Sequence, residues 1–312
     1  MSETEKKVKI ALDECRVLML GAQILFGFHL RAVFEEQFTS LPSTSRILYV
    51  FAFAAMGVVL ALLIAPSMQH RLVESGRTSG RIVAATTLFA GLALAPFALS
   101  LGVDIAIVFS FKFGTLTGAT LGLIIAGLAL GLWYGIEYVL KRPNAKERAM
   151  PEEHDTPIDV RVEHMLTESR VLLPGAQALF GFQLAVLLTP AFDKLAENLK
   201  LAHALALCSI ALTVILLMTP AALHRISFGG QNTESFHRLG SAFVIAAAVP
   251  LALGISADLY VAISKALGSL AVGVAVACAL AVLFAALWFV QPLALRHRYH
   301  PGPRPEAGGA LD

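Results

Sequence analysis

Long apolar segments separated by short polar and charged clusters dominate the pattern of this chain. A helix needs about 20 mainly apolar residues to cross the hydrocarbon of a bilayer. Lipid offers the backbone no hydrogen-bond partner, so segments of this kind are expected to be helical. The segments of sufficient length without Asp, Glu, Lys or Arg are 47–69, 82–103, 113–136, 171–192, 201–223, 239–257 and 266–295.

An eighth segment, 17–34, contains His29 and Arg31 but is also expected to span, because its counterpart in the second half carries no charge. That counterpart belongs to an internal repeat. The sequence 14–28 recurs as 168–182, which is 154 residues later. The same offset relates Pro66 to Pro220, His70 and Arg71 to His224 and Arg225, Pro96 to Pro250, and Asp104 to Asp258.

These matches keep their register from residue 14 to residue 104, which indicates tandem duplication of a four-span unit. An even number of spans returns the chain to its starting side, so both units are expected to insert in the same orientation, about an axis along the membrane normal. The predicted fold class is an all-α integral membrane protein with eight transmembrane helices in two parallel four-helix repeats. The expected divisions are a first repeat 1–140, a polar cytoplasmic linker 141–167, a second repeat 168–298 and a disordered tail 299–312.

Composition narrows the class of protein further. Charged residues make up 15% of the chain and the mean hydropathy is +0.72, whereas soluble domains carry about 25% charge. A soluble globular protein is therefore excluded, and a net charge of +2 offers no basic footprint for nucleic acid. Lys and Arg gather in the N-terminal segment, the linker, the tail and the loops after the second and sixth spans, so both termini are predicted to be cytoplasmic.

The phrase Glu-x-Arg-Val-Leu-x-Pro-Gly-Ala-Gln-x-Leu-Phe-x-Phe at 168–182 is followed by Pro220-x-x-x-His224-Arg225. It resembles an uncharacterised family of small bacterial four-span membrane proteins, some of which are labelled sodium:proton antiporters. The resemblance covers both units, with Leu20 in the first where the second has Pro174. It implies a bacterial plasma (inner) membrane location and Na⁺ or H⁺ as candidate partners beside the lipid bilayer.

Charged residues at the cytoplasmic helix ends form one candidate site. A carboxylate, an imidazole and two guanidinium groups at one depth could accept protons or gate ions. The alternative is an interfacial salt bridge that pins antiparallel helices, and it is favoured because charges at helix ends cost little. The residues concerned are Glu14, Arg16, His70 and Arg71 in the first unit and Glu168, Arg170, His224 and Arg225 in the second.

Other polar positions also recur in both units. Gln23 and Gln177 are expected either to line a cavity or to bond neighbouring helices, because an unpaired amide is costly in hydrocarbon. Proline removes a backbone hydrogen bond, so helix breaks or kinks are expected at Pro96 and Pro250. Asp104 and Asp258 are candidate outer carboxylates; because each follows an apolar segment, a solvated loop or helix cap is the favoured interpretation.

Glycines at four-residue spacing in the fourth span (Gly114, Gly118 and Gly122) predict close helix packing, either between the units or in a homo-oligomer. The three cysteines have no paired spacing and are interpreted as buried apolar residues. No phosphate-binding, zinc-protease or nucleophile-elbow motif occurs, so no cofactor, no metal and no enzyme activity is expected.

Two functions remain. One is a secondary cation/proton antiporter, with Glu14 and Glu168 as candidate proton carriers and His70 and His224 as their partners. It would draw on an ion gradient. The alternative is a non-catalytic structural or scaffolding membrane protein, in which the shared polar positions hold helices in register.

Overall fold

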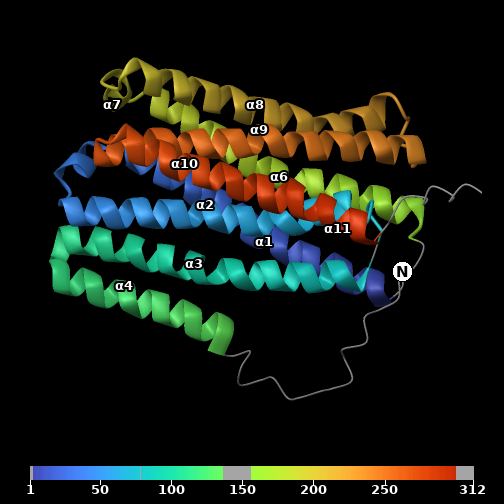
Figure 1. Ribbon diagram of the computed structural model, residues 1–312, viewed down its shortest axis with the longest axis horizontal. Helices are drawn as coiled ribbons and strands as arrows, with labels where there is room; N and C mark the ends of the chain where they lie inside the picture. The colour runs from blue at the N-terminus through green and yellow to red at the C-terminus, as the bar shows by residue number, and fades with distance from the viewer. Residues whose placement is uncertain (1–2, 78, 136–155, 300–312) are drawn as a thin grey trace, which may run out of the picture.

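The computed structural model describes residues 3–77, 79–135 and 156–299, and long helices account for most of this part of the chain (Figure 1). The first repeat contains α1 (Glu3–Ala32), the 3-10 turn η1 (Glu36–Ser40), α2 (Ser43–Leu72), α3 (Gly80–Phe113), α4 (Thr115–Leu130) and the π-helical η2 (Gly131–Gly135). The second repeat contains α6 (Ile158–Leu187), α7 (Pro190–Asp193), α8 (Glu197–Ile226), α9 (Glu234–Leu267), α10 (Leu270–Ala285), the π-helical η3 (Ala286–Val290) and α11 (Gln291–Tyr299).

Seven described helical segments are long and apolar enough to cross a membrane, which supports a multi-pass membrane protein. Leucine and valine side chains on their outer faces are exposed, as expected where lipid replaces water. α1 is not among the seven, although its 30 residues equal the length of α2. Gln23, His29 and Arg31 lower its hydropathy, so the eighth span stays a prediction.

Several expected boundaries are wrong. Residues 158–167, assigned to the linker, form the first part of α6. The remaining linker residues up to 155 and the tail from 300 lie outside the described residues. α3 and α9 continue well beyond Asp104 and Asp258 and end where Gly114 (φ 93°) and Gly268 (φ 65°) follow. Glycine tolerates this positive φ, so the chain turns there, and both aspartates lie inside helices.

The two repeats lie side by side in one bundle. α1 packs along α6, and both begin at the same end of the bundle, where α11 also ends (Figure 1). α2 is the central helix, in contact with α1, α3, α9, α10, η3 and α11, and 61% of its apolar 18-residue stretch is buried. The core at this position includes Phe26, Phe53 and Met56, each almost fully buried.

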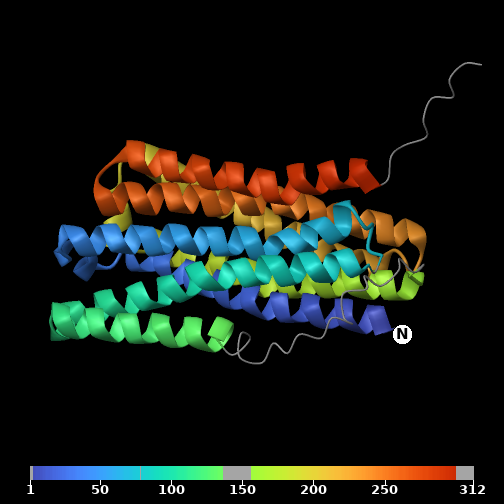
Figure 2. The ribbon, with the colours of Figure 1, turned by 60° about the horizontal axis from the view of Figure 1, so that its bottom comes forward.

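The last helices of the repeats have the same local structure in different surroundings. α4 and α10 have 16 residues each, and each continues into a five-residue π-helical segment that contains a tryptophan. α10 and η3 cover α2, and Trp288 Nε1 donates to the Ala61 carbonyl at 2.9 Å. α4 packs mainly on α3 at the opposite edge of the bundle (Figures 1 and 2). Only 11% of its apolar 18-residue stretch is buried.

Candidate functional site

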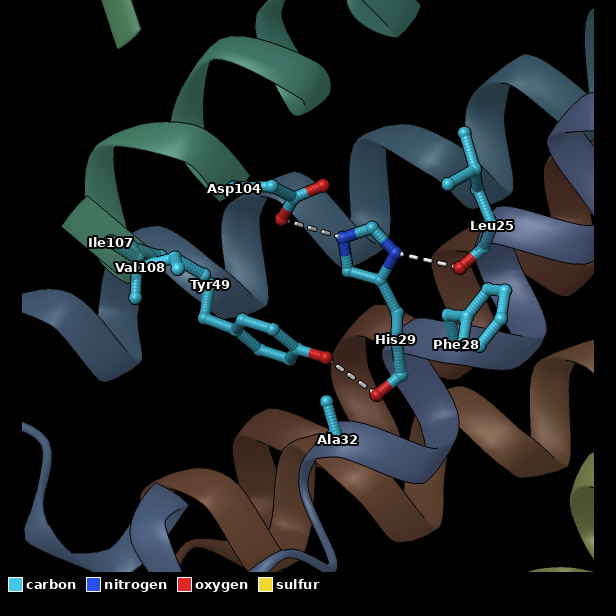
Figure 3. Close-up of a pocket in the computed structure, with 8 residues that line it drawn as sticks. All are labelled: Leu25, Phe28, His29, Ala32, Tyr49, Asp104, Ile107 and Val108. Carbon is cyan, nitrogen blue, oxygen red and sulfur yellow. Dashed lines mark hydrogen bonds and ion pairs between the residues drawn. The ribbon is translucent and has the colours of Figure 1, made fainter. Parts of the chain in front are cut away.

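A carboxylate and an imidazole meet between the first three helices of the first repeat. α1 supplies His29, α3 supplies Asp104, and Tyr49 of α2 lies beside them (Figure 3). His29 Nε2 lies 3.0 Å from Asp104 Oδ1, and His29 Nδ1 lies 2.9 Å from the Leu25 carbonyl oxygen. The Tyr49 hydroxyl donates to the His29 carbonyl at 2.6 Å, which holds α2 against α1 at this depth.

His29 bonds through both nitrogens of its ring. A carbonyl oxygen only accepts, so Nδ1 must donate to Leu25. Nε2 and Asp104 Oδ1 form a hydrogen bond only with a proton between them, carried either by an imidazolium or by a neutral carboxylic acid. Both ring nitrogens of His29 therefore have a hydrogen-bonding partner, one on its own helix and one on α3.

A pocket gives access to this pair. It has a volume of about 190 Å³ and is lined by His29, Tyr49 and Asp104 together with apolar side chains. The His29 side chain is 4% exposed and that of Asp104 27%, so the carboxylate forms the accessible side of the pair. A second pocket of about 350 Å³ shares Tyr49 with the first and extends to Glu35 and Lys112 near the ends of α1 and α3. The two pockets together connect the pair with one end of the bundle.

The same three positions in the second repeat form a sealed site. Gln183, His203 and Asp258 replace His29, Tyr49 and Asp104 at the 154-residue offset, and all three are fully buried. Gln183 Nε2 donates to Asp258 Oδ2 at 2.8 Å, and His203 Nε2 donates to the Gln183 carbonyl at 3.0 Å. His203 Nδ1 is 3.9 Å from Asp258 Oδ1, too far for a hydrogen bond.

Sequence reasoning identified only part of these two sites. It selected Asp104 and Asp258, but as boundary residues, and it treated His29 only as a weakness of the first span. Tyr49 and His203 were missed, although the 154-residue offset relates them. In both repeats this second-helix ring donates to the carbonyl of the residue that faces the aspartate, so a common geometry persists where the residue type does not.

A second polar cluster joins the two repeats near the helix ends where α1 and α6 begin. Arg71 of α2 pairs with Glu168 of α6, and their side chains are 1% and 2% exposed. Arg71 Nη1 also donates to the Ser241 hydroxyl of α9 at 3.0 Å. The buried rings of His70 and His164 lie beside this pair, with centroids 5.9 Å apart. Acid, imidazole and guanidinium thus meet across the repeats.

The other members of the expected clusters are not assembled within each repeat. Arg16 is buried and its Nη1 contacts Asp13 at 2.5 Å. His224 is half-buried and bonds to the Asn232 side chain. The remaining expected members are exposed: Glu14, Arg170 and Arg225.

The two glutamines have opposite surroundings. Gln23 is fully buried and its amide lies against Gly175 of α6, but neither amide atom has a hydrogen-bond partner among the described residues, so the expected bond to a neighbouring helix is not formed there. Gln177 is exposed. α3 and α9 run on through Pro96 and Pro250, so neither proline breaks its helix, and a kink at these positions stays a prediction.

Cys15 is buried as expected, but Cys208 and Cys278 are exposed, so the prediction of three buried thiols is wrong for these two. Within the described residues no group of three or more His, Cys, Asp or Glu side chains could hold a metal ion.

A family model matches the chain twice, over residues 3–137 and 151–292, and its description is a family of unknown function (DUF6328). The two matches agree with an uncharacterised domain in tandem. No curated protein and no solved structure matches the chain.

Proposed function

For this chain, which belongs to the DUF6328 family, we propose a function in proton binding and transfer within a membrane, with the His29–Asp104 pair as the proton site. The observation that carries the proposal is the 3.0 Å contact between His29 Nε2 and Asp104 Oδ1 inside the helix bundle, beside a pocket that reaches the carboxylate. Ionisable residues inside membrane helices are rare and commonly mark ion or proton routes.

The surroundings of the pair support exchange with solvent. The pockets beside Asp104 extend to the η1 end of the bundle, which the distribution of Lys and Arg assigns to the outer side. Glu14 and Glu168 are less suited as proton carriers, because Glu14 is exposed and Glu168 is bound to Arg71. We extend the proposal to secondary cation/proton antiport, in which Na⁺ or K⁺ would compete with the proton for Asp104.

The test uses purified protein in liposomes with an internal pH-sensitive dye. An outward or inward Na⁺ or K⁺ gradient should drive proton movement through the wild-type protein. Asp104→Asn removes the carboxylate and should lower the rate at least about a hundredfold, in the range typical of a lost acid–base group. Asp193→Asn is the matched control, because Asp193 is an exposed carboxylate on α7 that lines neither of the two pockets beside the pair. Asp258→Asn should change the rate less, because the sealed site exchanges protons poorly.

Folding of each preparation is checked by circular dichroism and by elution volume. No gradient-dependent proton movement by folded wild-type protein would refute the antiporter. Equal rates for Asp104→Asn and the wild type would remove the pair from the proton route.

One observation favours a second candidate, the non-catalytic structural or scaffolding protein. The buried contact between Arg71 and Glu168 joins the two repeats, as expected of polar residues that hold helices in register. In that case the liposomes would show no gradient-dependent proton movement, while Arg71→Met would still destabilise the protein.

A further inference from the structure

The two repeats contact each other through different faces. On α1, Gly27 lies against the ring of Phe182, and Gln23 lies against Gly175 of α6. A two-fold axis between the repeats would bring Gly181 against Phe28 in the same way. Gly181 is instead exposed, with no atom within 4 Å of an added Cβ, whereas the partly exposed ring of Phe28 packs against the ring of Phe182, with centroids 4.7 Å apart.

The charged residues near the helix ends are also used in one repeat and unused at the equivalent positions of the other. Arg71 of the first repeat binds Glu168 and the Ser241 hydroxyl of the second. At the 154-residue offset the corresponding residues are Arg225, Glu14 and Thr87. All three are exposed, and neither Arg225 nor Glu14 makes an ion pair with another described residue.

The tryptophans that follow α4 and α10 differ between the repeats in the same way. Trp288 is fully buried, and its indole donates to the Ala61 carbonyl of α2. The equivalent of Ala61 is Ile215 on α8, which is 61% exposed and lines an open groove of about 1000 Å³ together with Arg170 and Arg225. Trp133, at the third position of η2 as Trp288 is of η3, follows α4, and Figure 1 shows α4 and α8 at opposite edges of the bundle.

Two faces can now be defined. Face A is the surface that the first repeat presents to the second, and face B is the surface that the second repeat presents in return. Each chain also has an unused face A on its second repeat and an unused face B on its first. The used face A contains Arg71, Gly27 and Ala61, and the used face B contains Glu168, Ser241 and Trp288. The unused face A contains Arg225, Gly181 and Ile215, and the unused face B contains Glu14, Thr87 and Trp133.

We propose that a second copy of this chain docks its unused face B into the unused face A, and so completes a second Arg–Glu cluster like the one between Arg71 and Glu168. Contacts between non-equivalent faces repeat head to tail, and they form a closed ring where the rotation from one repeat to the next closes. Two chains supply four repeats, and in a closed dimer every face is occupied. Glu14 of one copy then binds Arg225 of the other, Thr87 takes the place of Ser241, and Trp133 covers the groove at Ile215.

The charges and the exposed areas agree with this occupant. The open groove carries Arg170, His224 and Arg225, whereas the incoming face carries the carboxylate of Glu14. α4, the least buried of the seven apolar helices, would gain the cover that α10 already receives from α2. The dimer does not depend on proton transfer, so its test is independent of the liposome assay.

Charge exchange tests the predicted ion pair in the full chain, with native mass spectrometry in detergent as the readout. The wild type should be dimeric. Glu14→Arg alone and Arg225→Glu alone should each raise the dimer dissociation constant more than about tenfold, since truncating a buried charge pair has effects of this size or larger. The chain that carries both changes should recover the dimer. Asp193→Arg, an exposed control on α7, should leave it unchanged.

A second experiment does not depend on charge energetics. Two differently tagged chains, with Cys15, Cys208 and Cys278 replaced by alanine, are co-expressed; one carries Glu14→Cys and the other Arg225→Cys. A thiol crosslinker as long as a carboxylate–guanidinium pair should join the two tags in membranes, and should not do so when Asp193→Cys replaces Glu14→Cys. A monomeric wild type, or two tags that fail to crosslink in folded protein, would overturn the proposal.

Discussion

Replacing Arg71 by methionine would leave the carboxylate of Glu168 without its partner between the two repeats. The side chains of Arg71 and Glu168 are 1% and 2% exposed, so water cannot replace the guanidinium. Removal of one member of a buried ion pair costs about 3–5 kcal/mol. Replacing both members by apolar residues is often neutral. We therefore expect Arg71→Met to lower the free energy of unfolding by about 3–5 kcal/mol, and Arg71→Met with Glu168→Met to recover most of that loss.

The assay is unfolding in mixed micelles by titration with a denaturing detergent. Trp288 reports on the interface because it is buried between η3 and α2, and Trp133→Phe in all variants removes the second indole signal. Lys9→Met is the matched control. Lys9 of α1 and Glu163 of α6 also join the two repeats, but their side chains are 38% and 58% exposed, and such a pair contributes less than about 1 kcal/mol. Equal losses for Arg71→Met and Lys9→Met, or a double variant as unstable as Arg71→Met alone, would refute the reasoning.

Three further predictions concern packing and protonation. Gly27→Ala should destabilise the chain by about 1–3 kcal/mol in the same titration, because the added Cβ would overlap the Phe182 ring. Gly181→Ala places its Cβ in open space and should be neutral or stabilising by up to about 1 kcal/mol in the monomer. Equal effects of the two changes would contradict the assignment of the used and unused faces. Trp288→Phe should lower the free energy of unfolding by about 1–3 kcal/mol, since the Ala61 carbonyl loses its side-chain donor. Trp133→Phe should change the stability of the monomer little. A larger loss for Trp133→Phe than for Trp288→Phe would be inconsistent with the structure. Infrared difference spectra between acidic and basic pH should contain bands of a carboxyl or imidazole group that disappear in Asp104→Asn and change in His29→Gln, and a spectrum unaltered by both changes would exclude the shared proton.

The duplication and most of the helices follow from the sequence because both depend on local patterns. An apolar segment of sufficient length forms a helix in lipid whatever lies beside it, and the 154-residue offset relates residues without any knowledge of contacts. Even the helix ends that were predicted wrongly had a local signal, because Gly114 and Gly268 mark the turns after α3 and α9. Asp104 and Asp258 could have been placed inside helices on that evidence.

Only the tertiary structure decided which copy of each motif is buried. Glu14 and Glu168 share one sequence motif, as do Gln23 and Gln177, yet one member of each pair is buried and the other exposed. A motif present in both repeats contains no information that distinguishes them. The difference arises because α2 of the first repeat packs on helices of the second whereas its counterpart α8 packs mainly within its own repeat, so that these motif positions meet a helix in one copy and open surface in the other.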